Sequence, residues 1–264
     1  MAAVILISMG LGLVTGLLAG MLGIGGGSVV VPALVYVFAK EHLPAGLAMK
    51  LAIGTSLANI LFTSLAAISA QQKRRAIDWS VAAPLGAATL VGSLASGYLA
   101  GLLPGLVLKE IFGVFLTAVG LQLFADWHPA AHWRLPSYPG LVGVGIGIGA
   151  MSALLGIGGG SLTVPFLTAC NVDMRRAIAI SATLGFPIAL FGAMGLALSG
   201  QHRAGLPPGA LGYIYLPALA GLTTVAMLVV PVGVYLAHNL PVAQLKRVFG
   251  VLLIAVGVQM VFGT

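Results

Sequence analysis

The sequence has few charged residues, and this scarcity limits the kinds of protein that it can be. Only 6% of its 264 residues are Asp, Glu, Lys or Arg, whereas 59% are hydrophobic. The mean hydropathy is +1.11. A water-soluble chain could not cover so much apolar surface with so few polar groups. The composition therefore excludes a soluble globular protein and predicts a chain embedded in a lipid bilayer.

Cysteines and acidic residues are scarce, which excludes several kinds of site. The single cysteine, Cys170, excludes an intrachain disulfide and a metal site built from several cysteines. All five acidic residues lie near expected helix ends, so no buried carboxylate indicates a proton or sodium relay. The five histidines lack metal-ligand spacing, and no Ser-His-Asp or Cys-His arrangement follows from position. We therefore expect no enzyme activity, no cofactor and no metal.

The positive net charge of +7 does not indicate a nucleic-acid partner. The twelve Lys and Arg residues are scattered in short linkers, without a basic face that aromatic residues interrupt. We interpret them as topology signals of a membrane protein. No positive region precedes the first apolar stretch, so we expect no cleaved signal peptide and a first helix that remains.

Apolar runs long enough to cross a bilayer recur along the whole chain. A helix needs about 20 mostly apolar residues to cross the hydrocarbon region. Uncharged runs lie at 3–22, 76–108 apart from Asp78, 111–125, 135–172, 177–202 and 204–244. The pattern predicts an all-α, polytopic integral membrane protein.

An internal repeat is the strongest signal in the sequence. The seven letters LGIGGGS occur at 22–28 and again at 155–161, each followed at the same distance by Val-Pro. Both copies also share upstream glycines and a Lys-x-x-Phe-Gly segment near their ends. The linker between them is rich in Trp, His and Pro, which is typical of a membrane interface. We therefore divide the chain into a first membrane repeat, 1–126, an interfacial linker, 127–139, and a second membrane repeat, 140–264.

Each repeat contains a hairpin whose second arm is too short for an ordinary crossing. These arms, 28–38 and 161–170, have about half the required length, and whether they span fully is left open. Counting them gives five segments per repeat and inverted repeats, whereas omitting them gives four segments and parallel repeats. The Lys and Arg residues divide eight to four in the first case and seven to five in the second. We therefore predict a helical bundle of inverted repeats with glycine-broken hairpins and both termini outside.

The two glycine turns are the predicted binding site. Four glycines within five residues cannot hold a regular helix, and an open backbone in a membrane survives only inside protein or beside water. Paired interruptions in two repeats indicate a transporter's central site, and the helix start after each turn attracts anions. Close helix packing is the alternative, and we favour it for the upstream glycines. The turn residues predicted to bind substrate are Gly25, Gly26, Gly27, Ser28, Gly158, Gly159, Gly160 and Ser161.

A polar cluster opens the helix that follows each hairpin. Its groups could donate to an oxyanion, but hydroxyls in membranes also bond back to their own helix. Lys50 and Arg176 precede the clusters and could attract an anion, although an interfacial anchor is the favoured explanation for both. The predicted supporting donors are Thr55, Ser56, Asn59, Ser181 and Thr183.

These motifs resemble those of the TauE/SafE family of membrane permeases. The resemblance rests on the two GIGGGS turns with Val-Pro, on Gly-Thr-Ser-Leu at 54–57, and on the Lys-x-x-Phe-Gly starts of the last helices. It covers nearly the whole chain and implies export of sulfite or organosulfonates across the bacterial cytoplasmic (inner) membrane. The second repeat departs from the pattern, with Ser-Ala-Thr at 181–183.

We therefore expect a secondary permease for a small sulfur-containing anion, with the two repeats rocking around the glycine turns. A passive anion channel on the same scaffold and a non-transporting membrane assembly partner are the alternatives. The expected partners are the small anion and the lipid bilayer. A coupling ion, proton or sodium, and a homo-oligomer are left open.

Overall fold

The computed structural model describes residues 2–22, 26–125, 133–201, 203, 205–239 and 242–262, which form ten helices and one short hairpin. The first repeat contributes α1 (Ala2–Leu22), α2 (Gly27–Lys40), α3 (Ala45–Lys73), α4 (Trp79–Leu102) and α5 (Gly105–Phe124). The second contributes α6 (Tyr138–Leu155), α7 (Gly160–Ala169), α8 (Met174–Gly200), α9 (Leu216–Asn239) and α10 (Val242–Phe262). Between α8 and α9, β1 (Ala210–Leu211) pairs with β2 (Ile214–Tyr215).

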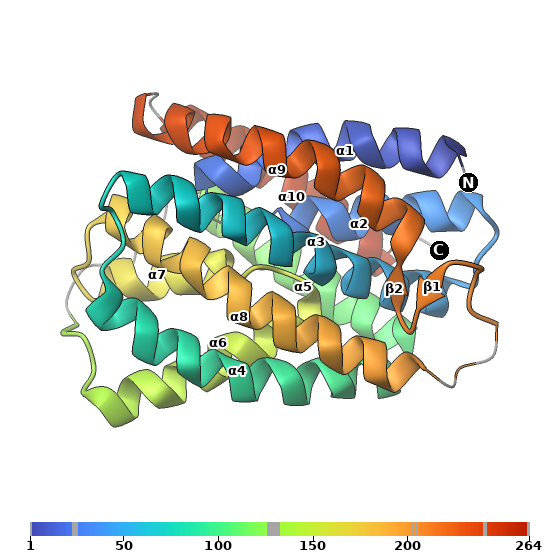
Figure 1. The fold of residues 1–264 in the computed structure, drawn as a ribbon, viewed down its shortest axis with the longest axis horizontal. Coiled ribbons are helices and arrows are strands. Elements are labelled where there is room, and N and C mark those ends of the chain that lie inside the picture. The colour runs from blue at the N-terminus through green and yellow to red at the C-terminus, as the bar shows by residue number, and fades with distance from the viewer. Residues whose placement is uncertain are drawn as a thin grey trace.

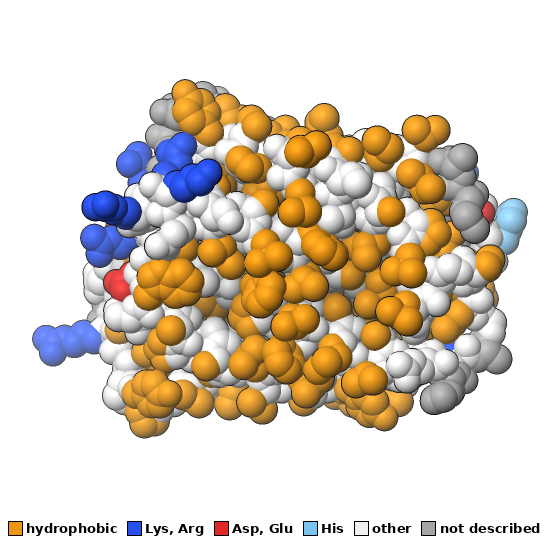
Figure 2. Space-filling view, in the orientation of Figure 1, with side chains coloured by type: hydrophobic (Ala, Val, Ile, Leu, Met, Phe, Trp, Pro, Cys, Tyr) orange, Lys and Arg blue, Asp and Glu red, His pale blue; other side chains and the backbone are white. Residues whose placement is uncertain are grey.

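The lengths of the helices and the apolar surface are those of a polytopic membrane protein, which confirms the predicted fold class. Among the described residues, seven helices are long and apolar enough to cross a membrane. Hydrophobic side chains cover the middle of the face in Figure 2, and Lys and Arg gather at one end. Helices α2 and α7 are shorter, with 14 and 10 residues. At about 1.5 Å per residue, α7 reaches about half of the hydrocarbon thickness.

Polar residues at the linkers define where the long helices begin. The carboxylates of Asp78 and Asp173 accept backbone N–H bonds from Ser80 and Arg175, at 3.1 and 3.0 Å. Each therefore caps a helix start, where backbone N–H groups have no partner within the helix. The two helices that follow the hairpins and carry the predicted polar clusters are α3 and α8.

Helices α3 and α8 form the centre of the bundle and pack against each other. Figure 1 shows them running in opposite directions. Around this pair, α1 of the first repeat packs mainly against α9 of the second, and α6 of the second packs against α4 of the first. A two-fold relation between the repeats would produce this exchange of neighbours. The inverted orientation of the repeats remains a prediction.

Small residues allow the exchanged helices to approach closely. A Cβ atom added at Gly16 of α1 would lie only 2.8 Å from the Ala226 carbonyl oxygen of α9. One added at Gly149 of α6 would overlap the Thr89 carbonyl oxygen of α4. Only glycine permits such backbone contact, as in other small-residue interfaces between membrane helices. The packing interpretation of the upstream glycines is confirmed.

The segment before α9 interrupts the uncharged run at 204–244. Tyr213 lies in the tight turn between β1 and β2, and α9 begins three residues later, at Leu216. Gly209 and Gly212 have φ angles of 87° and 54°, a left-handed conformation that favours glycine and ends helical geometry. The chain consequently turns back on itself and packs a short hairpin against α3.

The linker between the repeats is described only in part, because residues 126–132 lie outside the described residues. Its described end contacts the end of α7. The Trp133 N–H donates to the Ala169 carbonyl oxygen at 3.2 Å, and the Asn171 side-chain amide donates to the Trp133 carbonyl oxygen at 3.1 Å. Helix α6 begins at Tyr138, within the expected linker. The domain boundaries otherwise remain predictions.

Candidate functional site

Both glycine turns interrupt a helix at the predicted place. The first joins α1 to α2, and Gly26 immediately before α2 has a φ of 70°. The second joins α6 to α7, with Gly156 and Gly159 at φ angles of 70° and 77°. Residues with a side chain rarely adopt these left-handed angles. Gly25, which we predicted to bind substrate, lies outside the described residues.

The two glycine turns lie against each other. A Cβ atom added at Gly27 would overlap the Gly156 carbonyl oxygen and would lie 2.9 Å from the Ile157 Cα. The Ser56 hydroxyl of α3 donates a hydrogen bond to the same Gly156 carbonyl oxygen at 2.8 Å. Backbone from the two repeats therefore meets at one point beside α3, although the turns are far apart in the sequence.

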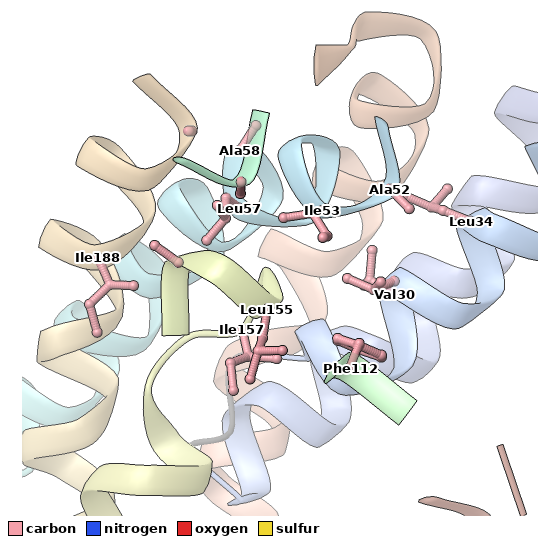
Figure 3. Close-up of a cluster of buried hydrophobic side chains, with 14 of the residues drawn as sticks. Val30, Leu34, Ala52, Ile53, Leu57, Ala58, Phe112, Leu155, Ile157 and Ile188 are labelled. Atoms are coloured by element: carbon pink, nitrogen blue, oxygen red, sulfur yellow. The ribbon is translucent and has the colours of Figure 1, made fainter. Parts of the chain in front are cut away.

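Apolar packing holds the second turn in place. Leu155 and Ile157 are fully buried. In Figure 3 they lie between Ile188 of α8 on one side and Val30 of α2 and Phe112 of α5 on the other. Elements from both repeats thus enclose the turn. The open glycine backbone is therefore buried inside protein, as a membrane requires.

Four buried hydroxyls near the turns lack a hydrogen-bond partner among the described residues. They belong to Ser28 of α2, Ser161 and Thr163 of α7, and Ser152 of α6, all at most 6% exposed. A Cβ atom added at Gly159 would lie 3.6 Å from both the Ser152 Oγ and the Thr163 Oγ1. An unsatisfied buried polar group costs about 1–3 kcal/mol. Ser28 and Ser161 lie at matching places in the two repeats. Unsatisfied buried groups of this kind indicate that a ligand or water supplies the missing bonds.

The Val-Pro that follows each turn leaves a second polar group available. Pro32 and Pro165 lie inside α2 and α7, four residues after Ser28 and Ser161. Proline has no N–H, so it cannot donate to the carbonyl oxygen four residues before it. The carbonyl oxygens of these two serines therefore lack their usual helical donor, and their hydroxyls have no partner in the part of the chain that the structure describes.

A small cavity lies beside the second turn, between α3 and α8. Its volume of about 10 Å³ is close to the minimum that one water molecule needs. The hydroxyls of Thr63 and Ser64 bond back to α3 at 3.3 and 3.0 Å. The lining residues are Ala19, Ile60, Thr63, Ser64, Ala67, Gly158, Ala182 and Gly185. Gly158 is therefore a predicted turn residue that borders internal space.

The predicted supporting donors make hydrogen bonds within the protein. The Thr55 Oγ1 accepts from the Tyr215 N–H of β2 at 2.9 Å, and the Asn59 Oδ1 accepts from the Thr223 hydroxyl of α9 at 3.3 Å. These bonds join α3 to the second repeat. Two hydroxyls of the second cluster bond back to α8 at 3.0 Å: Ser181 and Thr183. Their roles as ligand donors remain predictions.

The two cations proposed to attract an anion lie at opposite ends of the bundle. Lys50 is buried near the start of α3, where its Nζ donates to the Gly101 carbonyl oxygen at 2.7 Å. Arg176 is exposed near the start of α8. Because α3 and α8 run in opposite directions in Figure 1, their starts are far apart. The contacts of Lys50 are with α4 and the hairpin rather than with a glycine turn.

Sequence reasoning missed Ser152 and Thr163, and the repeat itself explains why. These residues correspond to Ala19 and Val30 in the first repeat. They are therefore not among the features that both repeats share, on which the prediction depended. The available signal was a difference between the copies, since the second turn has two additional hydroxyls nearby.

Replacing Ser56 with alanine should loosen the junction of the two turns. The change removes the hydrogen bond to the Gly156 carbonyl oxygen, and we expect the free energy of unfolding to fall by about 1 kcal/mol. A lower melting temperature of the purified protein would report this loss. Ser69→Ala is the matched control, because the exposed Ser69 bonds back to its own helix and should leave the melting temperature unchanged.

Comparisons with known proteins identify relatives that are named as membrane transporters. A Haemophilus influenzae protein named "Probable membrane transporter protein" is 34% identical over 258 residues, which cover 97% of each chain. A Methanocaldococcus jannaschii relative with the same description is 29% identical over 223 residues, covering 84% of this chain and 79% of its own. The Bacillus subtilis relative YunE is 30% identical over 224 residues, covering 76% of this chain and 82% of its own.

No solved structure gives a significant match to the chain. Residues 8–260 match the family described as sulfite exporter TauE/SafE. This match spans nearly the whole chain and both glycine turns, and the relatives are named as membrane transporters. The chain therefore belongs to the TauE/SafE family and is a membrane transport protein.

Proposed function

We propose that the protein is a secondary permease that exports sulfite or a small organosulfonate across the bacterial inner membrane. The observation that carries the proposal is the junction of the two glycine turns. At the starts of the two helices that leave these turns, Ser28 and Ser161 occupy matching positions of the repeats and have buried hydroxyls without partners among the described residues. In this proposal these hydroxyls and the neighbouring backbone N–H groups donate hydrogen bonds to the oxygens of the anion.

Neutral donors suit an anion carrier because the empty site carries no charge. The first backbone N–H groups of α2 and α7 have no partner within their helices, and each helix start carries about half a positive charge. These partial charges stabilise an anion as at other helix starts. When the anion leaves, no cation is left unpaired in the membrane interior, where an isolated charge is costly.

The small size of the cavity beside Gly158 supports a carrier rather than an open channel. With room for about one water, this part of the site is closed in the present conformation. We infer that the repeats must move relative to each other before an anion can enter. A channel on the same scaffold would instead need a continuous wet path.

Charge distribution supports a cytoplasmic position for one end of the bundle. Exposed cations lie at the end of α3 and at the start of α8, and Figure 2 shows Lys and Arg gathered at one end. The chain termini lie at the other end in Figure 1. Cytoplasmic loops of membrane proteins are enriched in Lys and Arg. We therefore propose that both termini are outside.

Uptake of labelled sulfite into proteoliposomes tests the proposed function. We expect accumulation driven by an imposed pH or sodium gradient, and competition by organosulfonates should rank the substrates. Protein-free liposomes give the background. Flux that only equilibrates, under every gradient, would identify a passive channel. The absence of uptake by folded protein, with organosulfonates also inactive, would contradict the proposed cargo.

A further inference from the structure

A second, larger pocket opens at the end of the bundle that carries the chain termini. It lies between the start of α3, the turn from α4 to α5 and the segment before α9, and its volume is about 400 Å³. This volume is within the range of about 300–1,000 Å³ for small-molecule sites. Lys50 and Arg203 both line it, whereas no acidic residue does among the described residues.

Lys50 is an unusual residue for this position because its side chain is 5% exposed. Its Nζ donates to the Gly101 carbonyl oxygen at 2.7 Å and lies 5.2 Å from the centre of the Tyr213 ring. A lysine ammonium has three N–H bonds. A carbonyl oxygen and a neutral ring stabilise the charge but do not neutralise it, and a buried charge without a counter-ion is costly.

Tyr213 fixes the second cation in relation to the first. The Arg203 Nε donates to the Tyr213 hydroxyl at 3.1 Å, so the two cations contact the ring and the hydroxyl of one side chain. Tyr213 itself is 1% exposed. A Cβ atom added at Gly54 of α3 would overlap its carbonyl oxygen, which shows how closely the backbone packs there. The ring therefore acts as a rigid spacer between the two cations.

We propose that this pocket binds a small oxyanion, such as a sulfonate, between Lys50 and Arg203. The two cations offer N–H groups from different directions, and an anion with several oxygens can accept from both. Gly105 in the first turn of α5 also lines the pocket, where backbone N–H groups add partial positive charge. The site is separate from the glycine turns. Only its use as an outer vestibule for the cargo depends on the proposed transport function.

Cysteine labelling of purified protein in detergent tests the site without any transport step. The Cys170→Ala, Leu102→Cys double variant places one reactive thiol in the pocket wall, where the native leucine is 58% exposed. Reaction rates are measured with 2-sulfonatoethyl methanethiosulfonate and with its trimethylammonium counterpart. The ratio of the two rates cancels changes in thiol reactivity. We expect this ratio to exceed that of free 2-mercaptoethanol by about tenfold.

Two substitutions and one control assign the effect to the pocket. Lys50→Gln and Arg203→Gln should each lower the ratio by about threefold or more. Lys40→Gln should leave it unchanged, because Lys40 is exposed and lies over a different ring, that of Tyr36. Arg203 is exposed, so its variant keeps the test valid even if the Lys50 variant does not fold.

Protection by an unlabelled anion tests for binding rather than general attraction. Methanesulfonate should slow labelling, whereas chloride at the same ionic strength should not; sulfite is unsuitable because it attacks disulfides. Equal rates for both reagents, equal protection by chloride, or an equal effect of Lys40→Gln would overturn the proposal. Sulfite uptake can fail while methanesulfonate still protects, so failure of the transport proposal is distinguishable from failure of this one.

Discussion

Valine in place of Gly27 should abolish transport while the protein is still made and inserted. The added Cβ would overlap the Gly156 carbonyl oxygen, and neither backbone can move aside without separating the two turns. Overpacking of this kind costs about 1–3 kcal/mol, and we expect the initial rate of sulfite uptake to fall at least about tenfold. Gly26→Val and Gly159→Val should act similarly, since both positions have a positive φ.

A glycine outside the turns provides the matched control for these variants. A Cβ atom added at Gly147 of α6 would meet no atom within 4 Å. Gly147→Val should therefore preserve uptake and membrane insertion. Normal insertion with unchanged flux in both the Gly26 and the Gly159 variants would show that the glycine turns are not the binding site.

The double variant Ser28→Ala, Ser161→Ala should be more stable than the native protein and should bind its anion more weakly. Each buried hydroxyl lacks a partner among the described residues, so its removal should raise the free energy of unfolding by about 1 kcal/mol. Hydrogen bonds to charged groups contribute about 1.5–3 kcal/mol each, so affinity should fall about tenfold or more per serine. Melting temperature and the half-saturating sulfite concentration measure the two effects.

Ser93→Ala is the control for this pair of effects. Ser93 is also fully buried, but its hydroxyl donates to the Thr89 carbonyl oxygen of its own helix. Its removal should not raise the melting temperature and should leave half-saturation unchanged. A destabilised Ser28, Ser161 double variant with native affinity would show that these serines serve only the fold.

The helical architecture could be predicted from the sequence because its signals are local. Apolar runs define the long helices, and clustered glycines force the backbone to open where the structure has Gly26 and Gly159 in left-handed conformations. The repeat added one long-range prediction, that the two turns form a single site. The contact of Gly27 with Gly156 brings them together, while their role in binding remains a proposal.

The hydrogen-bond partners of individual polar side chains could not be predicted, because a hydroxyl on a membrane helix can form its hydrogen bond in two ways. It can bond back to its own helix, as Thr183 does, or reach a distant group, as Thr55 does with Tyr215. The choice depends on which element packs alongside. The hairpin that supplies the Tyr215 N–H has no counterpart in the short link between α3 and α4, so the repeat gave no indication of it.

The same difficulty applies to the pocket that contains Lys50. Its second cation, Arg203, lies 153 positions later in the chain. From its position alone, we favoured an interfacial anchor for Lys50 over a role in attracting an anion. The structure instead joins it to Gly101 and Tyr213, because α3, α4 and the hairpin converge where each enters or leaves the bundle.

The exchange of α1 and α6 between the repeats has a consequence for how the protein is made. During synthesis α1 emerges well before its main neighbour α9, because seven other helices lie between them in the chain. Until then the glycine face of α1, which receives the backbone of Leu222 and Ala226, has only lipid or a substitute partner to contact. We therefore expect that neither repeat folds independently, because a chain released after α5 would lack the surface of α9 against which α1 packs.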